Sequence, residues 1–168
     1  GRRQYEEVLL TVERTDRELL EKTEVAEKYQ PTLQLSPGQT GTVECEVGTV
    51  EYCVCDRAAA HEKNQEVPTN QYTKWFDYDK IKKCPVIRTR KPGVYLTIAD
   101  GRGGMIHKSL ISYLGDQKIP QAERDRLPIL AEGEHVLWVV GYRISEYYKV
   151  TENTKRILKV QLIRKEFA

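Results

Sequence analysis

The chain has 168 residues, of which 39% are hydrophobic and 31% charged, and its formal net charge is +2. No apolar run approaches the roughly 20 residues that a membrane-spanning helix needs, so we expect a soluble, cytoplasmic domain with no membrane partner. The chain begins at Gly1 and its only methionine is Met105. We therefore interpret it as an excised fragment.

Positive charge is concentrated in one part of the chain. Residues 1–79 hold nine Lys or Arg against sixteen Asp or Glu, whereas residues 80–118 hold nine against two. Residues 119–168 are nearly balanced, with nine against seven. A local basic excess of this size is typical of a surface that binds a polyanion. A basic face that contacts only solvent is the alternative.

The first half of the chain predicts mainly β-structure. Alternating apolar residues predict a strand at 4–13, and looser helical spacing predicts a short helix at 15–28. Residues 42–56 predict a hairpin whose turn lies at Gly48-Thr49. The polar stretch 57–71 predicts a long exposed loop.

The basic band follows. Residues 86–90 predict a strand with a cationic outer face, and residues 94–99 predict a second strand. A glycine-rich turn at 100–104 then leads into a helix predicted at 107–113, which Gly115 ends. Backbone N–H groups before a helix and the positive end of its dipole attract phosphate. The simpler alternative is a tight turn without a ligand.

The remainder predicts one more short helix and the closing strands. Pro120 fits the start of the helix and Pro128 its end. The charges at 123–125 predict ion pairs that hold this helix rather than acid–base catalysis. Strands are predicted around Trp138, which we expect in the core, and at 156–163.

Together these elements predict an α+β fold with one mixed sheet of six or seven strands and two or three short helices. We expect a single domain over residues 1–168, with a variable β-rich lead at 1–70 and a core at 75–163. No Cys-x-x-Cys pair occurs and the histidines are scattered, so we expect no metal site. The four cysteines are interpreted as half-buried thiols in a reducing compartment: Cys45, Cys53, Cys55 and Cys84.

A succession of short motifs in the second half is similar to a known family. The motifs are Phe76–Ile81, Arg88–Gly93, Lys118–Pro120, Glu123–Asp125, Leu127–Pro128, Leu137–Gly141 and Arg143–Ile144. In this order they resemble the C-terminal domain of bacterial tRNA(Ile)-lysidine synthetase. The chain departs from the family at Val94-Tyr95-Leu96, where Asp-Arg-Phe is usual, and at His107-Lys108, where paired lysines are usual.

The resemblance implies a parent enzyme that uses ATP to adenylate the wobble cytidine of an isoleucine tRNA, after which lysine displaces AMP. That chemistry belongs to an N-terminal domain with a Ser-Gly-Gly-x-Asp-Ser loop, and no such loop occurs here. We therefore expect a catalytically silent chain with neither ATP nor magnesium of its own. The implied partners are the isoleucine tRNA, held largely at its acceptor stem, and the N-terminal catalytic domain.

The candidate tRNA-binding residues are the cations of the basic band: Arg88, Arg90, Lys91, Arg102, Lys108 and Lys118. Phosphate contacts from such residues give affinity rather than sequence reading. For Lys118 and Arg124, pairing with Asp116 or Asp125 is the alternative. Two other functions stay open: an editing-type domain related to the phenylalanyl-tRNA synthetase β chain, and an oligomerisation module in which a second copy of the chain is the partner.

Overall fold

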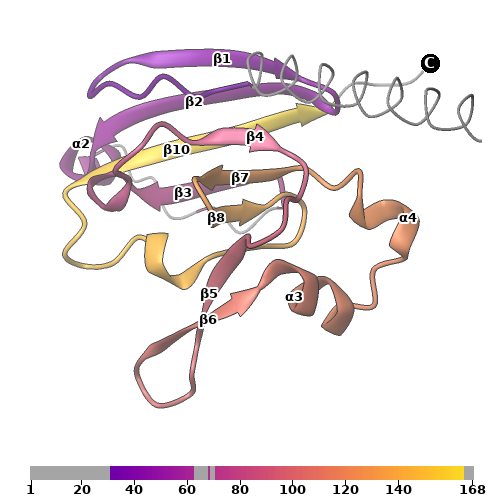
Figure 1. The fold of residues 1–168 in the computed structure, drawn as a ribbon. Helices are drawn as coiled ribbons and strands as arrows, with labels where there is room; N and C mark the ends of the chain where they lie inside the picture. Colours follow the sequence, from indigo (N-terminus) through magenta and orange to yellow (C-terminus); the bar gives the residue numbers. More distant parts are fainter. Residues whose placement is uncertain (1–30, 63–67, 69–70, 165–168) are drawn as a thin grey trace, which may run out of the picture. The chain divides into compact units, whose positions relative to one another are not determined.

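The computed structural model describes residues 31–62, 68 and 71–164. The strand and helix predicted at 4–13 and 15–28 lie outside these residues. The strands that the structure describes form two sheets, of four and six strands (Figure 1). The α+β class is therefore confirmed, but the strands divide between two sheets where one was predicted.

The four-stranded sheet is entirely antiparallel. Its order is β1 (Thr40–Cys45), β2 (Gly48–Asp56), β10 (Arg156–Arg164) and β3 (Thr73–Asp77). The predicted closing strand is thus central in this sheet, because β10 pairs with both β2 and β3. Buried side chains alternate along β2, where Val50, Tyr52 and Val54 point into the core.

The β1–β2 hairpin forms, but its turn lies at residues 46–47 and not at Gly48-Thr49. Gly48 opens β2, opposite Arg164 on β10. A Cβ atom at this position would lie 2.1 Å from the carbonyl oxygen of Ile163. Glycine is therefore required at this position because the backbone of β10 approaches closely, and not because the chain turns there.

The predicted loop at 57–71 is wrong in its first part, where α2 (Arg57–Glu62) forms. Its sequence contains three consecutive alanines, the residue with the best helix propensity. Ala60 is buried beside Trp75 and Ile157 on the outer side of the four-stranded sheet. The packing of Ala60 therefore adds to the helix propensity of the three alanines, which the polar residues around them in the sequence had hidden.

The six-stranded sheet takes three of its strands from the basic region 80–118. Its order is β4 (Val86–Arg88), β7 (Ile129–Glu132), β8 (His135–Val139), β5 (Tyr95–Ala99) and β6 (Met105–Ser109), with β9 (Arg143–Ile144) also on β8. The β5–β8 pairing is parallel and the others are antiparallel, so the sheet is mixed as predicted.

The helix predicted at 107–113 starts later than expected. Residues Met105–Ser109 form β6, which pairs with β5, and α3 spans Leu110–Asp116. The Ser109 hydroxyl caps α3 by accepting the N–H of Ser112 at 3.1 Å. Pairing along the whole of β5 outweighs the local helical spacing, so the glycine-rich turn is the tip of a β-hairpin.

The remaining helical segments are short. α4 (Gln121–Arg124) directly follows Pro120, as predicted. Two 3₁₀ turns also form: η1 (Tyr78–Lys80) follows β3, and η2 (Glu146–Tyr148) follows β9. α3 runs one residue past Gly115, and the left-handed residue after it is Lys118, with φ 55°. The predicted glycine stop is therefore wrong.

Two clusters of buried side chains stabilise the fold. One contains Phe76, Trp138 and Leu158 and joins the two sheets. The other contains Leu96 and Leu114 and joins the six-stranded sheet to α3. The six-stranded sheet is thus covered on both faces, which places Trp138 in the core as predicted.

Candidate nucleic-acid interface

Two N–H groups of the glycine-rich turn are used within the turn itself. Gly101 and Gly103 have φ values of 80° and 87°. One carboxylate oxygen of Asp100 accepts the N–H of Arg102 at 2.7 Å and that of Gly104 at 3.0 Å. These hydrogen bonds hold the pKa of Asp100 below its ordinary value. The turn leads into β6 and not into a helix, so the helix start that was predicted at this point is wrong.

Three of the predicted site residues stabilise the fold. The Arg88 guanidinium donates to the carbonyl oxygen of Gly133, and burial lowers its pKa while Glu134 partly opposes the change. Arg90 donates to one carboxylate oxygen of Asp125 through Nε at 3.1 Å and Nη2 at 2.7 Å. This pair ties the end of β4 to the residue that follows α4.

Lys108 belongs to the same group. It lies on β6 and its ammonium pairs with Asp116 at the end of α3. Arg124, at the end of α4, donates to the carbonyl oxygen of Ile119 at 2.7 Å. Asp116 and Asp125 are therefore paired with Lys108 and Arg90, not with Lys118 and Arg124 as the sequence alternative held.

Three other predicted residues are exposed: Lys91, Arg102 and Lys118. Arg102 lies at the tip of the β5–β6 hairpin, which projects at the bottom of Figure 1, and Lys118 follows α3. Within the described part of the chain, Lys118 forms no ion pair. The six predicted cations thus do not gather in one cluster. Arg102 lies between β5 and β6, and Lys118 lies just after α3.

A ladder of aromatic rings on the β5–β6–β8 face was missed by the sequence analysis. The Tyr95 ring stacks on both His107 and His135, with ring centroids 4.4 and 4.7 Å apart, and the two histidine rings lie 6.2 Å from each other, so the three rings form a triangular cluster. His135 also contacts the rings of Tyr147 and Tyr148 of η2 at 5.4 and 4.7 Å. The residues come from four segments that are separate in the sequence, so the grouping is visible only once the strands are paired. Thr97 lies opposite His107, which places His107 on the same sheet face as Thr97 and Tyr95.

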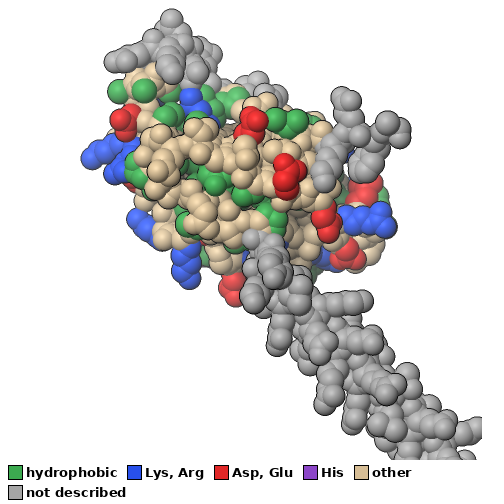
Figure 2. All heavy atoms as spheres, turned by 90° about the horizontal axis from the view of Figure 1, so that it is seen from above, with side chains coloured by type: hydrophobic (Ala, Val, Ile, Leu, Met, Phe, Trp, Pro, Cys, Tyr) green, Lys and Arg blue, Asp and Glu red, His purple; other side chains and the backbone are tan. Residues whose placement is uncertain are grey.

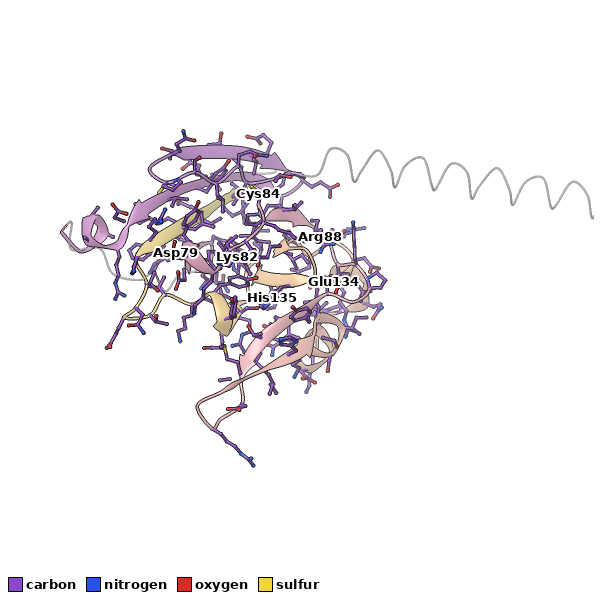
Figure 3. The ribbon with its side chains drawn as sticks, turned by 60° about the vertical axis from the view of Figure 1, so that its left-hand side comes forward. Asp79, Lys82, Cys84, Arg88, Glu134 and His135 are labelled. Carbon is purple, nitrogen blue, oxygen red and sulfur yellow. The ribbon has the colours of Figure 1, made fainter. Side chains whose placement is uncertain are left out.

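An open depression of about 500 Å³ lies beside this ladder, lined by Lys82, Lys83, Tyr95, Glu132, Gly133, Glu134 and His135 (Figure 3). One oxygen of Glu132 accepts the backbone N–H groups of Lys82 and Lys83 at 2.8 and 3.3 Å. Its other oxygen accepts the Tyr148 hydroxyl at 2.8 Å. Glu132 is therefore a structural anchor.

Burial lowers the pKa of His135 below its ordinary 6.5, with Glu132 opposing and His107 adding to the shift. The unfolded chain then binds a proton more readily than the folded chain, so stability is full above the ordinary pKa and is lost as pH falls below it. We expect the melting temperature to fall less in His135→Gln than in the wild type between about pH 7 and about pH 5.5. An equal fall in both proteins would contradict this.

In the view from above, Lys and Arg side chains lie mainly toward the rim, and a few acidic side chains lie among uncharged atoms (Figure 2). This distribution does not favour a polyanion on the face that the view shows.

The described part of the chain contains no helix long and apolar enough to cross a membrane. In that same part, no three His, Cys, Asp or Glu side chains gather where they could hold a metal ion. Cys84 is exposed, unlike the half-buried thiol that was predicted, and the other three cysteines are half-buried.

Comparison with known proteins identifies the basic half. Residues 86–162 match the family described as the TilS substrate C-terminal domain. Over these residues the chain is similar to the TilS C-terminal domain family. The resemblance given by the sequence motifs is thereby confirmed, and the match covers all six strands of the six-stranded sheet.

Relatives and a solved structure agree with the TilS assignment. The chain is 37% identical over 140 residues to a tRNA(Ile)-lysidine synthase of Caldanaerobacter subterraneus, covering 83% of this chain and 28% of the relative. It is 43% identical over 91 residues to one of Clostridium tetani, covering 54% and 19%. The crystal structure of a TilS C-terminal domain has the same fold, with a TM-score of 0.57 at 18% identity, covering 81% of this chain and 98% of that one.

Proposed function

We propose that this chain is the tRNA-binding C-terminal part of a tRNA(Ile)-lysidine synthase. The observation that carries the proposal is the TilS C-terminal domain match over residues 86–162, which includes most of the basic band. The matched relatives bear the name tRNA(Ile)-lysidine synthase. In the parent ligase, a separate N-terminal domain would bind ATP and magnesium and join lysine to the wobble cytidine. This chain would have no catalytic residue of its own and would act in the cytoplasm.

The exposed cations are the best candidates for contact with RNA. Arg102 at the hairpin tip and Lys118 after α3 are exposed and make no ion pair within the described residues, and Lys91, in the segment between β4 and β5, is exposed as well. Arg88, Arg90 and Lys108 would act chiefly by positioning β4, α4 and α3. Such contacts suit an acceptor stem, because proteins recognise A-form RNA by its shape, phosphates and 2′-hydroxyls.

The test compares two RNA hairpins, one built from the acceptor stem of an isoleucine tRNA and one from its anticodon stem. We expect the acceptor-stem hairpin to bind more tightly, with log affinity falling linearly as log salt concentration rises. Preference for the anticodon stem would move the chain's role to another part of the tRNA. Equal, weak binding of both would remove the tRNA-binding role.

A further inference from the structure

We propose that the ring ladder and the adjoining depression form a binding site for an unpaired nucleotide whose base carries an exocyclic amine, as cytosine, adenine and guanine do and uracil does not. The inference deepens the proposed function and rests on it. The ladder is formed by Tyr95, His107 and His135, and the depression beside it by Lys82, Lys83 and Glu134.

The ladder offers a stacking surface at its outer end. Tyr95 and His107 are nearly parallel, with 20° between their planes, and Tyr95 and His135 differ by 24°. His107 is exposed, whereas Tyr95 and His135, the two rings that it contacts, are half-buried. An unstacked base adds to such a series of rings through its π-face, as bases do on aromatic and histidine side chains in RNA-binding domains.

Hydrogen bonds fix the ladder before any ligand arrives. The buried Ser145 hydroxyl accepts the N–H of Thr97 at 3.1 Å and donates to the carbonyl oxygen of Val136. The Thr97 hydroxyl in turn accepts the N–H of Tyr147 at 3.0 Å and contacts the His135 ring at 3.4 Å. β5, β8 and η2 are therefore locked together behind the rings, so little side-chain ordering remains to oppose binding.

The depression supplies groups for the rest of a nucleotide. Lys82, Lys83 and Glu134 are exposed in its lining, and Figure 3 shows Lys82 and Glu134 to either side of His135. Lysine ammonium groups bind phosphate, and a carboxylate accepts a hydrogen bond from an exocyclic amine such as N4 of cytosine. Glu134 is the carboxylate available for this role, because both oxygens of Glu132 already accept hydrogen bonds.

These features favour an unpaired nucleotide over a duplex. Bases within a stem are already stacked and present only their groove edges, so they cannot join the ladder. Uracil has carbonyl groups where cytosine and adenine have an amine, so it would face the Glu134 carboxylate without a hydrogen bond. We therefore expect the site to prefer single-stranded RNA over a stem and, among single strands, bases that carry an exocyclic amine over uracil.

The experiment measures binding of labelled oligocytidylate, oligoadenylate and oligouridylate of equal length to the 168-residue chain. We expect the first two to bind at least about fivefold more tightly than oligouridylate, and Glu134→Ala to remove that preference. His107→Ala should weaken binding at least about fivefold, whereas His107→Phe, which keeps a ring, should retain most of it. The matched control is Ile106→Ala, since Ile106 is 49% exposed and its side chain points to the opposite face of β6.

Absence of oligonucleotide binding, or equal affinity of His107→Ala and the wild type, would overturn the inference. If the acceptor-stem hairpin still binds in that case, the proposed function stands and only the stacking site is lost. If neither RNA binds, both fail. Binding of a protein at the ring ladder in place of RNA would likewise overturn the inference.

Discussion

The double variant Arg102→Glu/Lys118→Glu is expected to bind isoleucine tRNA about tenfold or more weakly than the wild type near physiological salt. Both side chains are exposed, and neither is used in an ion pair within the described residues, so the fold should not change. Each phosphate contact contributes about 0.7–0.9 to the slope of log affinity against log salt. Loss of two contacts should therefore flatten the slope by about 1.5.

The matched control reverses two charges elsewhere. Lys149→Glu/Lys155→Glu changes the net charge by the same amount, and both lysines are exposed in the segment between η2 and β10. We expect its salt slope to equal that of the wild type. A similar loss in both variants would mean that net charge alone drives binding, and no loss in either would place the tRNA surface elsewhere.

The sequence predicted elements well where many apolar residues alternate within one segment. β10 is an example, since its buried residues Leu158, Val160 and Leu162 alternate with residues that are not buried. The strand that contains Trp138 was predicted from a continuous apolar run, and four of its five residues are buried. The prediction failed where a distant partner decides the structure. Residues 105–109 become a strand only because β5 pairs with them, and Gly48 is required only by the backbone of β10.

The same limitation affected the candidate site. Charge type is visible in the sequence, but the partner of each charge is not. The acceptors of Arg88 and Arg90 lie 45 and 35 residues away in the chain, and both interactions turn a predicted RNA contact into a structural tie. The ring ladder depends on strand order, because Tyr95 and His135 meet only where β5 pairs with β8.

The second large effect is expected in the core. Phe76 is completely buried on β3, opposite Leu158 on β10, and belongs to the cluster that joins the two sheets. Phe76→Ala should lower the free energy of unfolding by about 3–5 kcal/mol, because it removes buried apolar surface and leaves a cavity. That is a large part of the roughly 5–15 kcal/mol by which domains are stable. Urea unfolding would show a lower midpoint with an unchanged m-value.

This variant also tests whether the two sheets unfold as one unit. Because Phe76 shares its cluster with Trp138 of β8, amides of β2 and β8 should lose equal protection against hydrogen exchange in Phe76→Ala. Ile111→Ala is the control, since Ile111 is 58% exposed on α3 and its loss should change the free energy of unfolding by no more than about 0.5 kcal/mol. If β2 loses protection while β8 keeps it, the sheets are separate cooperative units, and the shared cluster contributes less to stability than its burial implies.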